Sequence, residues 1–114
     1  MKKEKLYLAH ILEASEKLAR YLPETLKELA DNEMAQDAII KNLANITESA
    51  DNLEKITKSE YPYIPWKQIK GMRNILVHDY LGDLSHEEIW RTVREDLPIL
   101  VEAAKKILKE KYGT

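Results

Sequence analysis

Apolar residues recur in steps of three and four along residues 33–59, and this spacing limits most strongly how the chain can fold. The apolar positions are Ala35, Ile39, Leu43, Ile46, Ala50 and Leu53. Such spacing is typical of the buried face of a helix in a bundle. Only 3 Gly and 4 Pro occur among the 114 residues, which favours long helices over short strands joined by turns. We therefore predict an all-α fold with one long helix over 33–59.

The residues before this segment predict one helix followed by a shorter one. Apolar spacing predicts a helix from about Lys5 to Leu22, and Pro23 interrupts it because its ring clashes with the preceding turn. Residues 23–30 then form a short helix or a bent continuation of the first. Asp31-Asn32 marks a boundary and offers a cap for the helix that follows.

The clearest linker is Tyr61–Pro65, because each residue before a proline is pushed toward extended backbone. Pro65 suits the first turn of the next helix, where its missing N–H has no partner to lose. We predict that this helix spans about Trp66 to Leu81 and ends at Gly82. Within it, Gly71 would allow another backbone to approach closely.

The last helix has a complete start signal. Ser85 and Glu88 have the spacing of a capping box, so Glu87 and Glu88 are interpreted as a helix start rather than as paired catalytic carboxylates. Pro98 predicts a kink near Arg94 and Glu95. Together these segments predict an up-and-down bundle of four to five helices, forming one domain over residues 1–114.

Composition excludes several classes of protein. The formal net charge is −2, so the chain is not a polycation that coats nucleic acid, although a local basic patch is allowed. Cysteine is absent, which excludes disulfides and thiolate metal sites. The N-terminus lacks the apolar run of a signal peptide, and no stretch approaches a membrane span. We expect a cytoplasmic protein without a membrane partner.

A group of functional side chains gathers near the end of the predicted helix 66–81. Arg73, Asn74, His78 and Tyr80 lie within eight positions. Asn74 and His78 share one helix face, and Arg73 and Tyr80 share another, because a helix turns by about 100° per residue. Arg73 and His78 are therefore about 140° apart, and one helix does not direct both at one atom. Two copies packed about a twofold axis would line one cleft with both residues, which favours a homodimeric site.

This set of residues suits RNA cleavage without a metal. An imidazole can move the proton of a ribose 2′-OH near neutral pH, and a guanidinium can hold the phosphate and stabilise developing charge. Lys67, Lys70 and Asn74 form a polar ridge that leads to His78 and could follow a phosphate backbone. The three histidines, at 10, 78 and 86, lack zinc-motif spacing, so we predict neither a metal site nor a cofactor.

Structural roles are an alternative interpretation of several of these residues. Arg73 could pair with Asp79 or Asp96, and His78 could satisfy a buried carbonyl group. On the polar face of the segment 33–59, Asn42 and Asn45 lie close to the apolar stripe and could be buried where subunits meet. A face of this kind is more often simply solvated.

The segment Trp66–Tyr80 closely resembles the core motif of the HEPN superfamily, and in particular that of the HepT-like toxins. The shared signature is Arg, four residues, His, one residue, Tyr, which corresponds here to Arg73, His78 and Tyr80. The resemblance extends to Gln36–Leu43 and to Ile89–Pro98. Relatives often carry glycine where this chain has Thr47, and this departure does not touch the motif.

The resemblance implies a dimeric helical bundle with metal-independent ribonuclease activity, acting as the toxin of a prokaryotic toxin–antitoxin pair. Arg73 and His78 would be catalytic, with Asn74 supporting them and Tyr80 completing the motif. The implied partner is a small MNT-type nucleotidyltransferase antitoxin that adds AMP to Tyr80. We expect RNA rather than DNA as the substrate. Two alternatives remain: a non-catalytic HEPN module that binds or positions a nucleotidyltransferase, and a plain structural helical dimer.

Overall fold

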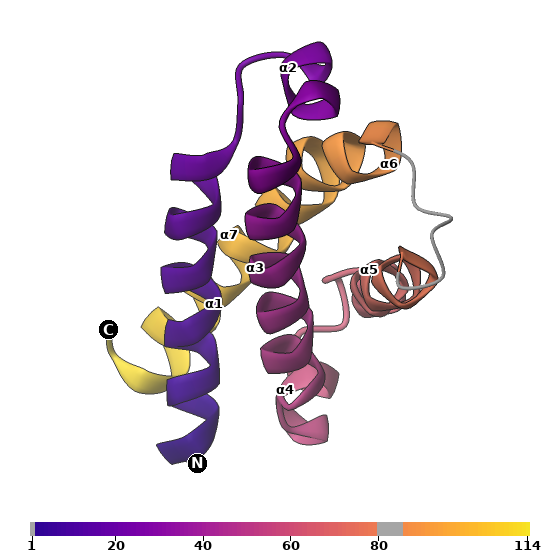
Figure 1. The fold of residues 1–114 in the computed structure, drawn as a ribbon. Coiled ribbons are helices and arrows are strands. Elements are labelled where there is room, and N and C mark those ends of the chain that lie inside the picture. Colours follow the sequence, from indigo (N-terminus) through magenta and orange to yellow (C-terminus); the bar gives the residue numbers. More distant parts are fainter. Residues whose placement is uncertain (1, 80–85) are drawn as a thin grey trace.

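The computed structural model describes residues 2–79 and 86–114, and the side chains of all of these except 2 and 74–79. The chain is all-helical over these residues, without a strand, as the sequence predicts (Figure 1). Its elements are α1 (Lys2–Tyr21), α2 (Leu26–Asp31), α3 (Glu33–Asp51), α4 (Lys55–Glu60), α5 (Trp66–Asp79), α6 (His86–Arg91), the π-helix η1 (Thr92–Asp96) and α7 (Leu97–Tyr112). The described residues thus contain seven α-helices, more than the four to five predicted, because two predicted segments are each divided in two.

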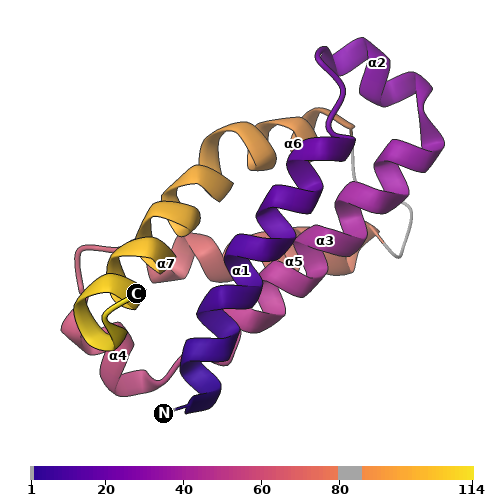
Figure 2. The same ribbon diagram turned by 90° about the vertical axis from the view of Figure 1, so that its left-hand side faces the viewer.

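The long helices pack around one apolar core. α1 and α3 run antiparallel side by side, α7 crosses them on one side, and α5 packs against α3 (Figures 1 and 2). The most deeply buried side chains of α1, α2, α3, α5 and α7 meet between these elements; they are Leu8, Ile11, Leu18, Leu29, Ile39, Leu43, Ile46, Met72, Leu100 and Ile107. Apolar burial of this kind is the main source of stability in such a bundle.

The predicted single helix over 33–59 is wrong, because α3 ends at Asp51 and α4 begins at Lys55. Between them, the N–H of Leu53 turns back to the carbonyl of Ala50, and the Leu53 side chain is buried. The N–H of Glu54 donates to the Glu4 carboxylate at 2.8 Å instead of continuing the helix. A buried side chain of α1 therefore captures a backbone donor at this point, a contact that local apolar spacing cannot reveal.

The disturbance expected near Arg94 and Glu95 is present, and it is a π-helical turn rather than a simple bend. η1 spans Thr92–Asp96, and Pro98 lies in the first turn of α7. Proline has no N–H to donate, and its ring clashes with the carbonyl four residues earlier. The wider π-helical turn accommodates both effects, and its last residue is the buried Asp96.

Helix caps account for several other boundaries. The Asn32 side chain caps α3 by accepting from the N–H of Ala35 at 3.0 Å, as predicted. Tyr61–Pro65 is a linker, and the carbonyl of Pro65 accepts from the N–H of Ile69 just as α5 begins. At Gly71 a Cβ would meet nothing within 4 Å among the described residues, so no described backbone of this chain uses the close approach that Gly71 would allow. The predicted end at Gly82 and cap at Ser85 lie outside the described residues.

Candidate functional site

A groove of about 320 Å³ runs between the C-terminal half of α3 and the first turns of α5. Its walls are formed by Thr47, Ala50, Asp51, Lys58, Trp66, Lys67, Ile69, Lys70 and Arg73. Four of these side chains are cationic and one is acidic, which gives the groove a formal charge of +3 in a chain whose net charge is −2. Such a local excess of positive charge attracts polyanions.

Packing of α5 against α3 explains why the cations face the groove. Ile69 and Met72 are buried, and this fixes the rotation of the helix. Lys67 and Lys70 are then exposed, as an amphipathic helix requires. The sequence predicts a ridge of Lys67, Lys70 and Asn74; both lysines line the groove, and the side chain of Asn74 is not among those described.

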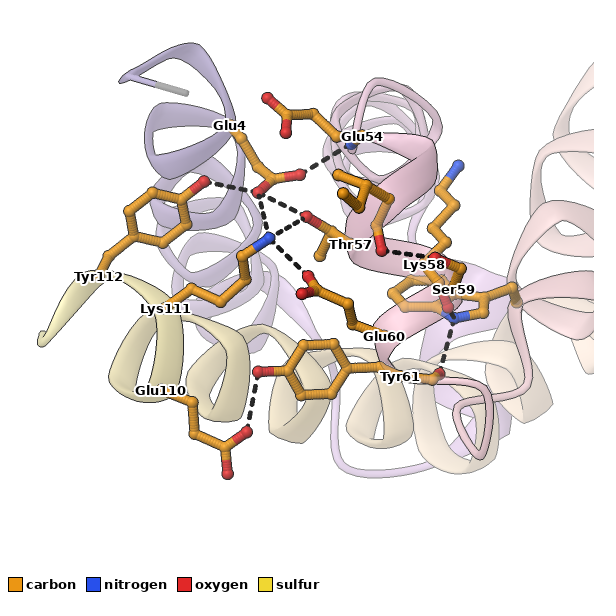
Figure 3. A network of polar contacts seen from close by, with 12 residues as sticks. Glu4, Glu54, Thr57, Lys58, Ser59, Glu60, Tyr61, Glu110, Lys111 and Tyr112 are labelled. Atoms are coloured by element: carbon orange, nitrogen blue, oxygen red, sulfur yellow. Dashed lines mark hydrogen bonds and ion pairs between the residues drawn. The ribbon is translucent and has the colours of Figure 1, made fainter.

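The indole of Trp66 holds α4 against the start of α5. Its N–H donates to the carbonyl oxygens of Lys58 and Tyr61 at 3.1 and 3.0 Å. This brings a fourth cation, Lys58, to the groove from the other side of the linker. In Figure 3 the Lys58 side chain points away from the polar cluster around Glu4.

Arg73 makes an ion pair across the groove. Its Nη1 donates to Oδ2 of Asp51 at 2.9 Å, and both side chains stay substantially exposed (53% and 39%). The predicted alternative of a pair with Asp96 is wrong, because Gln68 and Arg91 donate to that buried carboxylate at 2.8 and 3.1 Å. The other alternative concerned Asp79, whose side chain is not among those described.

The remaining motif residues are only partly described. Asn74 and His78 belong to α5, which is α-helical through Asp79, but their side chains are not described. Because the helix is regular, positions 73 and 78 keep their separation of about 140°. Tyr80 lies outside the described residues. The structure thus brings Lys67, Lys70 and Arg73 together and leaves the placement of the other three side chains as a prediction.

Sequence reasoning missed three residues of the groove: Asp51, Lys58 and Trp66. Lys58 and Trp66 lie on opposite sides of the Tyr61–Pro65 linker, and a tight turn there would have suggested that they meet. Asp51 carried a weaker signal, since nothing in the local sequence shows that the helix ends at this residue.

A second groove, of about 470 Å³, lies between α1 and α3 and is larger. Its charged lining residues are Glu13, Lys17 and Glu48, beside His10, so an anionic ligand gains little there. Asn45 is exposed in it, and Asn42 donates to the Ala38 carbonyl, as on an ordinary solvated face. The smaller, basic groove is therefore the stronger candidate for a polyanion.

Neither a metal cluster nor a membrane helix stands out among the residues described. No three acidic or histidine side chains of the described set are grouped closely enough to hold a metal ion. None of the described helices combines the length and the apolar character that crossing a membrane requires.

Comparison with known proteins identifies the family to which the chain belongs. Residues 11–107 match the family described as ribonuclease HepT-like. No solved structure matches the chain. The Arg73 and His78 positions of the motif lie on α5 of an all-helical chain, which is the architecture expected of the HEPN superfamily. Within that superfamily, this chain belongs to the HepT-like ribonuclease family.

Several relatives carry ribonuclease names. A protein of Caldanaerobacter subterraneus named "putative RNase" is 33% identical over 96% of this chain and 98% of its own length. A "probable ribonuclease HepT" of Thermococcus cleftensis is 33% identical over 90% of the chain and 94% of its own length. A Methanocaldococcus jannaschii protein named "gamma-glutamylcyclotransferase and putative RNase" is 37% identical, and the chain spans 48% of that longer protein.

Proposed function

We propose that this protein is a metal-independent endoribonuclease, the toxin of a HEPN/MNT toxin–antitoxin pair, and that it cleaves RNA in a cleft between two copies of the chain. Membership of a ribonuclease family supports the reaction class. The observation that carries the proposal is the basic groove beside Arg73, since a scaffold does not need four cations around one hollow.

The chemistry requires one imidazole and one guanidinium at the scissile phosphate. His78 takes the proton from the ribose 2′-OH, and the 2′-oxygen attacks phosphorus. The bond to the 5′-oxygen breaks, that oxygen takes a proton from water as it leaves, and the protonated His78 returns its proton to solvent, so that a 2′,3′-cyclic phosphate remains. Arg73 neutralises the charge that grows on the phosphate oxygens. Asn74, four residues before His78, supports the imidazole, and Lys67 and Lys70 bind neighbouring phosphates.

A dimer supplies both groups to one phosphate. Regular α-helical geometry directs positions 73 and 78 about 140° apart, so the Arg73 of one copy acts with the His78 of the other. Positions 67, 71, 74 and 78 share one helix face, and the open space around Gly71 supports a close approach of a second copy there.

The proposed partner is an MNT-type nucleotidyltransferase that transfers AMP to the Tyr80 hydroxyl. The phenol oxygen attacks the α-phosphorus of ATP, and pyrophosphate leaves. The added phosphodiester brings a negative charge and a bulky nucleotide to a residue that follows Arg73 by seven positions in the sequence. It would then occupy the phosphate site and repel RNA.

A direct assay tests the proposal. The purified protein is incubated with RNA in EDTA beside the variants His78→Ala and Arg73→Ala. Two matched controls, His10→Ala and Arg20→Ala, remove the same groups from exposed positions on α1. We expect cleavage by the wild type and by both controls, and none by the two motif variants. Equal behaviour of all five proteins would instead support a non-catalytic HEPN module or a structural dimer.

A further inference from the structure

The acidic residue of the basic groove has no role in the reaction described above. Asp51 is the one carboxylate among the described residues that line the groove, where it faces four cations. It belongs to α3, whereas its partner Arg73 belongs to α5. The pair therefore links a proposed catalytic side chain to a neighbouring helix.

Stability does not explain this pair well. Both side chains are substantially exposed, and exposed ion pairs contribute little to folding. Asp51 is also the last residue of α3, where the negative end of the helix dipole disfavours a carboxylate. The carboxylate thus stands at an unfavourable position for its own helix, next to the guanidinium that the reaction needs.

A carboxylate binds a guanidinium through the same N–H groups that a phosphate uses. In the free protein, Asp51 therefore orients Arg73 across the groove and occupies part of its hydrogen-bonding capacity. An incoming RNA phosphate has to share or replace this contact, and it also meets the negative charge of Asp51.

We propose that Asp51 is a positioning residue for Arg73, which fixes the guanidinium for catalysis while competing with the RNA phosphate for it. This inference rests on the proposed function. It goes beyond that function by assigning to α3 a residue that lowers the affinity for substrate and raises the rate of the chemical step.

The test is the affinity of Asp51→Asn for a short single-stranded RNA, measured by fluorescence anisotropy in the inactive His78→Ala background. We expect the Kd to fall roughly threefold to tenfold, because the Arg73 N–H groups that the Asp51 carboxylate occupies become available to the phosphate. The matched control, Asp37→Asn, removes the same charge from an exposed position elsewhere on α3 and should change the Kd less than twofold, as remote surface charges do.

Two further measurements separate positioning from general electrostatics and from structural damage. Adding Arg73→Ala to Asp51→Asn should abolish the gain in affinity, since the effect acts through Arg73. In the active protein, Asp51→Asn should lower KM and kcat together, because Arg73 is free to bind but poorly oriented. A gain that persists without Arg73, no gain at all, or a kcat that does not fall would each overturn the proposal.

Failure of the proposed role of Asp51 can be told apart from failure of the proposed ribonuclease activity. If the wild type binds RNA but does not cleave it, the ribonuclease proposal fails, and the positioning role fails with it because no kcat exists to be lowered. If the wild type cleaves RNA and Asp51→Asn leaves KM unchanged, only the role of Asp51 is overturned.

Discussion

Two charge-rich regions lie on either side of α4, and they differ in how their charges are used. Around Glu4, the buried carboxylate accepts hydrogen bonds from the Glu54 N–H, the Thr57 hydroxyl and the Tyr112 hydroxyl (Figure 3). Lys111 lies 4.0 Å from the same carboxylate and donates to Thr57. This cluster joins α1, α4 and the end of α7, and its polar groups satisfy one another.

The groove beside Arg73 has the opposite character. Among the described residues, Arg73 pairs only with Asp51, and no ion pair engages Lys58, Lys67 or Lys70. A charge that is buried and fully hydrogen-bonded serves the fold, whereas an excess of exposed cations remains available to a ligand. The comparison therefore predicts that variants around Glu4 lose stability and that variants in the groove lose activity.

The largest expected effect belongs to Arg73→Ala. Loss of a group that stabilises transition-state charge should reduce the rate of RNA cleavage by roughly 100-fold to 1,000-fold. The free energy of unfolding should change by less than about 0.5 kcal/mol, since the ion pair with Asp51 is exposed. Single-turnover cleavage assays and urea denaturation measure the two quantities. A large loss of stability would remove the contrast between the two regions.

Glu4→Ala should have the converse effect. It leaves the Glu54 N–H, Thr57 and Tyr112 without their acceptor, which should lower the free energy of unfolding by about 3 kcal/mol. Urea denaturation measures the change, and Glu13→Ala, an exposed position on the same helix, serves as the control. We expect the folded fraction of Glu4→Ala to cleave RNA at the wild-type rate. A selective loss of activity in that fraction would show that the two regions are coupled.

Glu4 should also contribute to the loss of stability in acid. Burial by itself raises the pKa of Glu4, but hydrogen bonds from Tyr112, the Glu54 N–H and Thr57 outweigh it, so this pKa lies below the usual 4.5. A lowered pKa in the folded state adds stability above pH 4.5, and this contribution is lost as the pH falls through the folded-state pKa. Glu4→Gln should therefore weaken the dependence of unfolding free energy on pH in this range. Unfolding curves at pH 3 to 6 give the comparison, and an unchanged slope would contradict it.

The smallest effects are expected from Lys67→Ala and Lys70→Ala. Each removes one exposed contact to phosphate, so RNA affinity should fall a few-fold and the salt dependence of binding should weaken by roughly one phosphate contact. Lys105→Ala, an exposed lysine on α7, is the matched control. Binding titrations at several salt concentrations give the slope of log Kd against log salt concentration. If each variant changes this slope no more than the control does, Lys67 and Lys70 do not contact RNA.

The sequence predicts the helices well where local signals decide them. Apolar spacing places α1, α3 and α5, and Asn32 caps α3 as its residue type suggests. The break between α3 and α4 was missed because its cause, a hydrogen bond from the Glu54 N–H to Glu4, joins residues fifty positions apart. Local periodicity carries no information about such a contact.

The candidate site was predicted in the same uneven way. Lys67, Lys70 and Arg73 follow from spacing along one helix, and they share a groove. Asp51 and Lys58 come from other elements, and only the packing of α3, α4 and α5 brings them there. Arg73 pairs with Asp51 rather than Asp96 because η1 turns Asp96 inward to Gln68 and Arg91.

The central claim, that Arg73 and His78 of different copies act on one phosphate, is tested most directly by complementation. Arg73→Ala and His78→Ala chains carrying different tags are co-expressed, and the mixed dimer is isolated by tandem affinity purification. One of the two Arg73–His78 pairs in the shared cleft would then be intact, so about half of the wild-type activity should return. A mixed dimer as inactive as its two parents would show that each chain acts alone, and would contradict the shared cleft.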